Sequence, residues 1–475
     1  MSPGDHPAGR LAGEPWHRLH PLSPMVRAGR GALAILVVLA GSALGGSARG
    51  NGDLYRLVAI GVAFAAGLVS WLVTRWRVEG GVLRIESGLL RRSSQRLPLN
   101  QIQAVDTVSP GMARMFRLAE VRVRMAGAKG SSGRLAYLAT PQAEALRARL
   151  LALAHGVAED SPAPPEQQLL SVPTGQLLTS LLLGGGGVVV VAMVAGLALL
   201  TALAPAAAGA VAGASVAVLV GSAGATWQRF NGEYHLTLAE SPDGLRVRAG
   251  LVERSAETIP RGRVQGLRLV EPLLWRPLGW CRVEVEVAGK SASGRRDRAA
   301  RRASRAILPV GSRAQAAWLI DRVMAGAPTD RRRPPRRARL KSPLRFQNLA
   351  WAVNQAYAVT ASGRLRRATD WVPLSKVQSI RWVQGPLQRR LGLASIHLDT
   401  AGRNVHAVLR DAGAAEAAEA MATLPGMCRT ARSADGRPGD HLARVRRSSG
   451  TDRPDVHPGL GPPAAPPRPS DPASI

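Results

Sequence analysis

The sequence predicts a membrane protein of mixed α and β structure, with four transmembrane helices in two hairpins and three copies of one β-rich unit. Two observations predict this fold class. A short phrase recurs three times with other residues at constant distances from it, and four segments long enough to cross a bilayer contain no charged residue. Repetition of residue types at fixed spacing is the signature of a duplicated structural unit.

The repeated phrase is P-x-x-x-[VI]-Q-x-[VIL]. A glycine stands ten positions before each of its prolines, and an Ala-Gly pair begins 28 positions after each. The prolines are Pro98, Pro260 and Pro373, and the glycines are Gly88, Gly250 and Gly363. Three ungapped copies of such a pattern are hard to obtain by chance, so the chain contains a triplicated unit.

Each copy is typical of antiparallel strands followed by one helix. In the first copy, residues 81–99 form a two-strand pattern that turns at Gly88, and residues 119–127 alternate apolar and polar side chains as a half-buried strand does. The turn requires glycine, because only glycine adopts positive φ without a steric penalty. A last strand follows, and then a helix over residues 141–155 with apolar residues at three- and four-residue steps.

The order of strands and closing helix, the proline phrase and the Ala-Gly turn together resemble the bacterial pleckstrin-homology-like (PH-like) domain. The alternation of such units with helix pairs resembles YdbT-type membrane proteins, over about residues 19–424. The resemblance implies a small antiparallel barrel or sandwich capped by a C-terminal helix. The third copy departs from the pattern, because no apolar pair of helices precedes it.

Four uncharged segments predict the membrane spans. A hydrocarbon core of about 30 Å requires an apolar helix of about 20 residues. The segments are residues 31–48, 57–74, 177–203 and 206–226. Arginines flank the first pair on its outer ends, and the positive-inside rule therefore places the N-terminus, the three β units and the C-terminal tail in the cytoplasm. The resemblance implies a multi-pass location in a bacterial plasma membrane.

The predicted domain order follows from these segments. It is an N-terminal cytoplasmic segment (1–30), transmembrane hairpin 1 (31–74), PH-like domain 1 (75–156), a linker (157–174), transmembrane hairpin 2 (175–227), PH-like domain 2 (228–326), a basic linker (327–343), PH-like domain 3 (344–426) and a disordered tail (427–475). The tail is rich in Pro, Gly, Ser and Arg and cannot bury enough apolar surface to fold.

The net charge of +31 directs attention to arginine clusters. Two of them, at residues 294–305 and 330–341, interrupt or link the β units, and a cytoplasmic location would bring them near anionic lipid, which attracts each basic residue by about 1 kcal/mol. The alternative is a solvated linker that binds nothing. Nucleic acid is disfavoured, because aromatic residues are not interleaved with the arginines. The candidate lipid- or partner-binding residues are Arg91, Arg92, Arg295, Arg296, Arg298, Arg301, Arg302, Arg305, Arg331, Arg332, Arg333, Arg364, Arg366 and Arg367.

Catalytic and cofactor motifs are missing from the sequence. There is no G-x-S-x-G elbow, P-loop or H-E-x-x-H motif, so we expect no enzyme activity and no cofactor or metal. Cys281 and Cys428 indicate neither a disulfide framework nor a metal site. The four consecutive glycines at 184–187 indicate either a flexible backbone or close helix packing, and small residues four apart in the helices allow oligomers to form through them.

The expected function is a binding module that displays three PH-like domains at the inner membrane surface. PH-like folds bind lipid head groups, peptides or proteins, and this extension rests on fold analogy. A second binding mode is the addition of a partner strand to an exposed sheet edge. The alternative function is a structural subunit of an envelope-protection or secretion assembly, held by its transmembrane helices.

Overall fold

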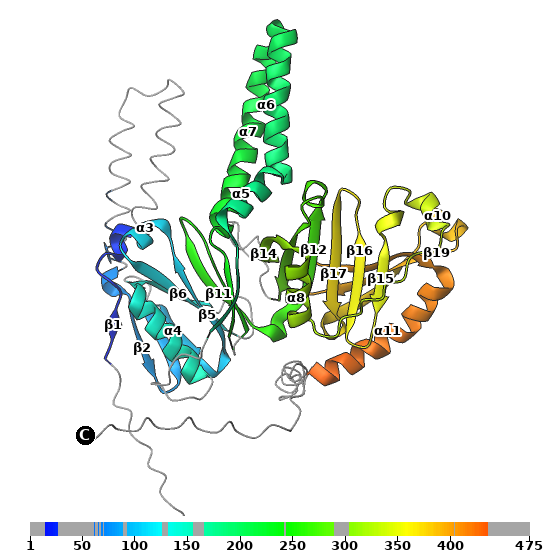
Figure 1. Cartoon of the computed structure of the whole chain (residues 1–475). Helices are drawn as coiled ribbons and strands as arrows, with labels where there is room; N and C mark the ends of the chain where they lie inside the picture. The colour runs from blue at the N-terminus through cyan, green and yellow to red at the C-terminus, as the bar shows by residue number, and fades with distance from the viewer. Residues whose placement is uncertain are drawn as a thin grey trace, which may run out of the picture.

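The computed structural model describes residues 15–26, 61, 65, 68–69, 71–88, 93–125, 132–154, 166–241, 244–288, 304–402 and 404–435. Within these ranges the chain forms three units that follow one another in a row (Figure 1). Each unit consists of three antiparallel strands, a sharp corner, three more antiparallel strands and a closing helix. The prediction of three repeated units with a C-terminal helix is confirmed.

The strands and helices occur in the same order in each unit. Unit 1 contains β2 (Arg75–Glu79), β3 (Val82–Ser87), β4 (Ser93–Pro98), β5 (Ile102–Ser109), α3 (Gly111–Met115), β6 (Leu118–Met125), β7 (Ser132–Ala139) and α4 (Thr140–Ala154). Unit 2 contains β9 (Thr237–Ser241), β10 (Gly244–Ala249), β11 (Arg254–Ile259), β12 (Val264–Pro272), η3 (Leu273–Trp275), β13 (Trp280–Val287), β14 (Ser304–Ser312) and α8 (Arg313–Val323). Unit 3 contains β15 (Ala350–Val353), β16 (Tyr357–Ser362), β17 (Arg366–Pro373), β18 (Val377–Val383), α10 (Pro386–Arg390), β19 (Leu393–Thr400), β20 (Ala407–Gly413) and α11 (Ala414–Asp435).

The repeated proline phrase is the corner between the two sheets of each unit. Pro98 and Pro373 are the last residues of the third strand, and Pro260 directly follows it. All three have φ near −60°, one 3-10 turn follows, and the fourth strand begins directly after the turn. These turns are η1 (Leu99–Gln101), η2 (Arg261–Arg263) and η5 (Leu374–Lys376). Proline fixes φ and has no N–H to donate, so it suits a position where one strand ends and the chain changes direction.

The glycine before each proline is the turn between the second and third strands, as predicted. Gly88, Gly250 and Gly363 have φ of 99°, 123° and 94°. A Cβ atom on Gly363 would lie 2.1 Å from the carbonyl oxygen of Arg366. The turn therefore excludes a side chain both by backbone conformation and by space.

Neighbouring units share their sheets, which the sequence did not predict. The fourth strand of one unit pairs antiparallel with the third strand of the next, so β5 pairs with β11 and β12 pairs with β17. These pairings create a seven-stranded sheet, β7-β6-β5-β11-β10-β9-β8, and a six-stranded sheet, β14-β13-β12-β17-β16-β15. Here β8 (Gln167–Ser171) is an added edge strand on β9, and β1 (His17–Arg18) has the corresponding place on β2.

Buried polar groups strengthen both junctions between units. At the first junction, Arg124 binds Asp106 at 2.7 Å within its own unit and Glu257 of unit 2 at 3.1 Å. At the second junction, the buried Glu286 of unit 2 accepts hydrogen bonds from the backbone N–H groups of Asn404 and Val405 at 2.8 and 2.7 Å. Charge-assisted hydrogen bonds of this kind are shorter and stronger than neutral ones.

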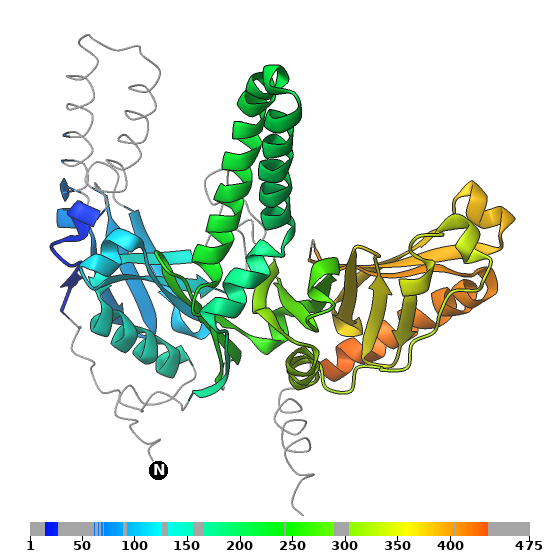
Figure 2. The same ribbon diagram turned by 45° about the horizontal axis from the view of Figure 1, so that its top comes forward.

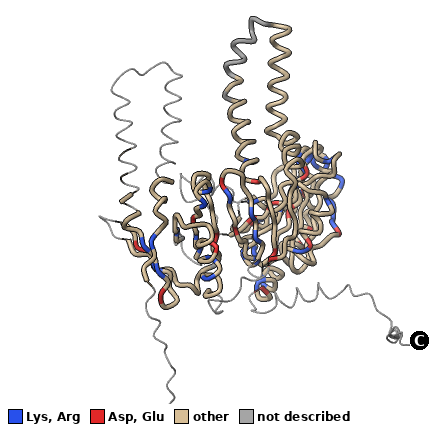
Figure 3. The backbone as a smooth tube through the Cα atoms, turned by 60° about the vertical axis from the view of Figure 1, so that its left-hand side comes forward, with Lys and Arg blue, Asp and Glu red and all other residues tan. Residues whose placement is uncertain are grey.

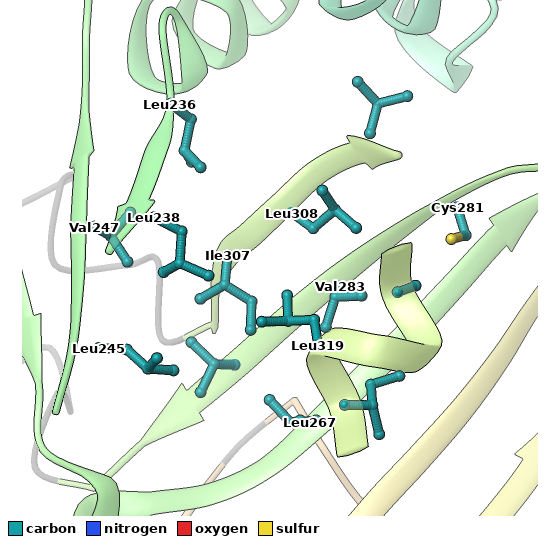
Figure 4. Close-up of a cluster of buried hydrophobic side chains, with 14 of the residues drawn as sticks. Leu236, Leu238, Leu245, Val247, Leu267, Cys281, Val283, Ile307, Leu308 and Leu319 are labelled. Carbon is teal, nitrogen blue, oxygen red and sulfur yellow. The ribbon is translucent and has the colours of Figure 1, made fainter. Parts of the chain in front are cut away.

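Unit 2 has an apolar core made by both of its sheets and α8. Figure 4 shows Leu238, Val247, Ile307 and Leu319 converging from the strands and the helix. Cys281 lies in the same core, and burial raises the pKa of its thiol to about 12. Cys428 is buried in unit 3, so both cysteines occupy packing positions as free thiols.

The apolar run before unit 2 is divided between a core helix and a projecting hairpin. It breaks at Leu183 and Gly184 into α5 (Thr174–Leu182) and α6 (Gly185–Leu203), and α7 (Pro205–Glu233) returns beside α6 (Figure 2). Leu177 of α5 is buried in the core of unit 2. Close packing at the consecutive glycines is confirmed, because a Cβ atom on Gly186 would lie 2.9 Å from the Oγ1 atom of Thr226 on α7.

The predicted fold class needs a correction at this point. Among the described residues, one helix, Gly185–Leu203, is long and apolar enough to cross a membrane, with a mean hydropathy of 2.4. The prediction of four transmembrane helices is therefore wrong for this structure, whose class is mixed α/β with several antiparallel sheets. One reason is that part of an apolar run, α5, packs into a β unit. The predicted hairpin at 31–74 lies mostly outside the described residues.

The C-terminal helix also differs from the prediction. The disordered tail was predicted from residue 427, but α11 continues to Asp435. Cys428 packs in the core of unit 3, and Asp435 binds the Nζ atom of Lys376 at 2.6 Å. The rest of the predicted tail lies outside the described residues.

Replacement of Gly363 by alanine tests the turn. We expect Gly363→Ala to lower the free energy of unfolding by about 1–3 kcal/mol, the cost of a strained backbone conformation. The matched control is Gly262→Ala, because Gly262 has no heavy atom within 4 Å of a built Cβ and its φ is not positive. Urea unfolding of the full chain in detergent measures both, and equal effects would contradict the steric argument.

Replacement of Arg117 by glycine tests whether removing a strained backbone conformation stabilises the chain. Its φ of 53° is left-handed, and the equivalent positions in units 2 and 3 are Gly279 and Gly392, with φ of 64° and 59°. Relief of the left-handed strain is worth about 1 kcal/mol, so Arg117→Gly is expected to raise the midpoint of thermal unfolding. Arg114→Gly, in the preceding short helix, is the control and is expected to lower the midpoint.

Candidate functional site

The short helices that follow the fourth strands expose apolar side chains in all three units. Helix α3 in unit 1, η3 in unit 2 and α10 in unit 3 occupy equivalent places between the fourth and fifth strands. The exposed large apolar residues of these segments and of the turns beside them are Met112, Met115, Phe116, Val252, Leu273, Leu274, Leu278, Leu365 and Leu387. We call this set the hairpin-side edge.

Hydrogen bonds connect this edge to the base of the α6–α7 hairpin. The backbone N–H of Gly250 donates to the carbonyl of Tyr234, directly after α7, at 2.9 Å. Arg114 of α3 donates to the carbonyl of Leu251 in the same turn. The guanidinium of Arg229, near the end of α7, lies 5.8 Å from the ring centroid of Trp275.

The same side of the row continues into unit 3. Arg276 donates a hydrogen bond to the carbonyl of Arg364 in the Gly363 turn. Figure 1 shows α3 and α10 on the side from which α6 and α7 project, while α4 and α11 lie on the opposite side. The three units therefore present equivalent loops in one direction.

Arginines accompany the apolar residues along the hairpin-side edge. Arg364, Arg366 and Arg367 are exposed at the turn between β16 and β17. Partial burial lowers the pKa of Arg276, and the positive charge of Arg367 lowers it further. Because like charges gathered at one place favour an anion, this part of the edge is suited to phosphate or carboxylate groups.

A basic cavity of about 260 Å³ lies where β12 of unit 2 meets unit 3. Its walls come from β12, β16, β17 and from β20 with the residue before it. The lining residues are Arg268, Thr360, Ser362, Arg366, Ala368, Asp370, His406, Val408 and Arg410. Three guanidinium groups face one carboxylate, with two hydroxyl groups beside them, so the cavity carries an excess of positive charge.

Asp370, the one carboxylate among the lining residues, already binds an arginine of the cavity. Asp370 binds the Nε and one terminal nitrogen of Arg268 at 2.6 and 2.9 Å. Burial raises the pKa of Asp370, although the hydrogen bonds from Arg268 oppose the rise. Arg366 and Arg410 are exposed, and the nearest carboxylate to Arg366 is Glu284 at 4.0 Å. These two arginines are the groups that can turn toward a bound anion.

The residues predicted as binding arginines fall into three groups. Arg91, Arg92, Arg295, Arg296, Arg298, Arg301 and Arg302 lie outside the described residues. Arg364, Arg366 and Arg367 lie together at the hairpin-side edge. Arg305, Arg331, Arg332 and Arg333 lie elsewhere, on β14 and in the linker before unit 3.

Two arginines of this last group contact side chains within the fold. Arg305 binds Glu257 on β11 and donates to the Oγ atom of Ser255 at 3.0 Å. Arg331 lies 5.7 Å from the ring centroid of Trp371, and burial lowers its pKa.

The linker that contains Arg331–Arg333 is docked on unit 3. The backbone of Arg332 pairs with that of Trp351, with hydrogen bonds of 2.8 and 2.9 Å, and its guanidinium lies 3.6 Å from Glu416 of α11. Farther along, α9 (Ala338–Lys341) and η4 (Phe346–Asn348) follow, and Lys341 binds the buried Asp411 at 2.5 Å. Arg333 is exposed.

Sequence reasoning missed Arg268, His406 and Arg410. The three residues are far apart in the chain and come from two units, and the cavity exists only because β12 pairs with β17. The sequence offered one signal for Arg268. Its equivalents in the other two copies are Asp106 and Arg381, so this position of the repeat is charged in every unit, with a different sign in unit 1.

The arrangement of corner, turn and closing helix defines a class of protein, a tandem array of small PH-like β units. A family model described as the bacterial PH domain matches residues 32–154, 179–327 and 323–423, and the chain belongs to this family. The first two matched ranges begin in the apolar segments that precede units 1 and 2. The comparisons with curated proteins and with solved structures gave no match.

Anion binding by the cavity can be measured with inorganic phosphate as the probe. A hydrogen bond to a charged group contributes about 1.5–3 kcal/mol, and partial exposure reduces this, so Arg410→Gln is expected to weaken phosphate binding about tenfold. The matched control is Arg389→Gln, an exposed arginine outside the cavity. Calorimetric titration of the full chain in detergent measures both, and equal losses would indicate binding by net charge alone.

Proposed function

We propose that the protein is a membrane-bound binding module whose three units lie on the cytoplasmic surface of a bacterial plasma membrane and bind anionic lipid head groups with the hairpin-side edge. The observation that carries this proposal is the exposure of apolar residues on equivalent loops of all three units, beside the exposed arginines of the Gly363 turn in unit 3. These loops face the side from which the apolar α6–α7 hairpin projects.

The dimensions and surface of α6 support its insertion into a bilayer. A helix of 19 residues is about 28 Å long, close to the thickness of the hydrocarbon core. Its side chains are mostly exposed, including Val191, Leu199 and Leu203. Figure 3 shows that the described part of the hairpin has no charged residue above its base. Such a surface is stable in lipid and would be unfavourable in water.

The strand pairing of unit 2 supports a return of the chain to the same membrane surface. β8 precedes the hairpin and β9 follows it, and the two strands are hydrogen-bonded neighbours. α7 therefore brings the chain back beside α6. The exposed Trp227 lies on α7 next to Thr226, which is level with Gly186 at the start of α6. Tryptophan at this level is typical of the membrane–water interface.

The hairpin-side edge has the composition of a surface that contacts a bilayer. Apolar residues such as Met115, Leu274 and Leu387 can enter the interfacial region, and each buried CH₂ group contributes about 0.8 kcal/mol. The neighbouring arginines are attracted to anionic head groups by about 1 kcal/mol each. The basic cavity beside Arg366 offers a place where one phosphate of a head group can be held.

Distance-dependent quenching tests this orientation. Cysteines introduced at Leu274 and Leu387 carry a fluorophore in the full chain, reconstituted into vesicles that contain nitroxide-labelled anionic lipid. Val194→Cys on α6 reports insertion, and Ala145→Cys on α4 is the control on the opposite side. The native Cys281 and Cys428 are buried and free, so they are not expected to react. Two sets of vesicles carry the nitroxide either on the lipid head group or on the acyl chain. We expect head-group nitroxides to quench the fluorophores at positions 274 and 387, and acyl-chain nitroxides to quench the fluorophore at position 194. The fluorophore at position 145 is expected to remain unquenched.

The arginines are tested in the same vesicles. Serine at Arg364, Arg366 and Arg367 is expected to reduce quenching at Leu274 at least twofold, while serine at Arg429 and Arg432 on α11 leaves it unchanged. Quenching at Val194 alone would contradict the lipid-binding edge and favour the alternative, a structural subunit that is held in an assembly by its helices. Lack of quenching at Val194 would contradict membrane insertion.

A further inference from the structure

The two junctions between units use the same strand register. In the first junction Ser255 of β11 lies opposite Val108 of β5, and in the second Ala368 of β17 lies opposite Val270 of β12. Ser255 and Ala368 are equivalent positions of the repeat, as are Val108 and Val270. Two independent copies of one contact therefore define a rule: the third strand of a unit accepts the fourth strand of the unit before it, in one register.

At the two ends of the row of units, the strands that could make this contact have no such partner. In the part of the chain that the structure describes, β4 pairs only with β3, and β18 pairs only with β19. β4 is the third strand of unit 1, and β18 is the fourth strand of unit 3. They belong to the two ends of the row (Figure 1), so one molecule cannot bring them together without losing its internal junctions.

The unpaired strand β18 exposes apolar side chains that are covered in the other copies. Val383 is 41% exposed, whereas the equivalent Val108 and Val270 are 6% and 1% exposed. Trp382, next to it, is also exposed. An edge strand with exposed apolar residues is a template for pairing with another strand, and proteins normally cover or charge such an edge.

We propose that β18 of one molecule pairs antiparallel with β4 of a second copy, in the register of the two internal junctions. This register places Val383 opposite Ser93, Trp382 opposite Ser94 and Arg381 opposite Gln95. No like charges face each other in these pairs. The second copy is the chosen partner because β4 is the one described free strand equivalent to the partners that β5 and β12 already have.

The direction of the membrane-facing loops agrees with this pairing. Both internal junctions keep the hairpin-side edge of successive units on one side of the row. A third junction of the same register continues this orientation, so the hairpins of both molecules project in the same direction. The contact is head-to-tail, and such contacts generate closed rings when the rotation closes and open filaments when it does not.

The intermolecular contact is expected to be weaker than the internal ones. At the second junction Arg268 faces Asp370 with two charge-assisted hydrogen bonds, whereas Arg381 would face the neutral Gln95 and already binds Asp399 at 2.5 Å within its own unit. Internal junctions also gain from the covalent link between units. The pairing between copies is therefore reversible and depends on protein density.

Disulfide cross-linking tests the register directly. Opposite residues on antiparallel strands have Cα atoms about 4.5–5.5 Å apart, which suits a disulfide. The full chain with Ser94→Cys and Trp382→Cys, oxidised in reconstituted membranes, is expected to give a ladder of covalent dimers, trimers and larger species. The pair Gln95→Cys and Trp382→Cys is the control, because adjacent strand residues point to opposite faces. It is expected to remain monomeric.

Single variants complete the test. A mixture of Ser94→Cys molecules with Trp382→Cys molecules is expected to stop at dimers that contain one of each. Dimers of Trp382→Cys alone would show that β18 pairs with its own copy and would overturn the head-to-tail arrangement. Equal cross-linking of the matched and shifted pairs, or monomers in both, would overturn the proposed pairing.

Discussion

The antiparallel pairing between the fourth strand of one unit and the third strand of the next determines most of what this chain can do. A strand edge with unpaired N–H and C=O groups must find a partner or remain in water. The corner at each repeated proline ends one sheet and begins another, so every unit presents two such edges. Because the two internal junctions have the same register, the loops with exposed Met115, Leu274 and Leu387 face the same way in all three units. The basic cavity exists for the same reason, since Arg268 and Arg366 come from strands on either side of a junction.

Residue spacing alone predicted the local structure of the repeat, because local constraints leave clear signals. Gly88, Gly250 and Gly363 recur where the backbone needs positive φ, and the prolines recur where one strand ends. The first and fourth strands of each unit were missed. In unit 1, β2 directly follows an apolar run and is only five residues long. The sharing of sheets between units is a contact between distant segments, and no periodicity reports which edge another strand will accept. Apolar composition also failed to separate α5 from α6, since a helix buried by protein and a helix with an exposed apolar surface can have the same residues.

Some arginines of the predicted clusters make contacts within the fold that the sequence does not report. Arg305 and Arg332 came from the two strongest clusters, yet both bind carboxylates of the fold. The guanidinium of Arg305 is partly removed from water and needs such a partner, which Glu257 supplies, whereas the Arg332 side chain is largely exposed. The arginines at the Gly363 turn had a weaker sequence signal, but they remain exposed next to apolar side chains and a basic cavity. Position relative to the sheets, which depends on the pairing of distant strands, decides which arginines can meet a ligand.

Unit 2 is discontinuous, and this has a consequence for the order in which the protein is made. β8 and α5 are synthesised before the α6–α7 hairpin, but β9 to α8, which bury them, are synthesised after it. Leu177 and Leu181 therefore stay without their core until the ribosome has completed α8. A hairpin that enters the bilayer during synthesis would hold the two separated parts of unit 2 at one membrane surface and shorten the search for their contacts. Under the proposed function, the membrane would serve as the template on which the central unit is assembled.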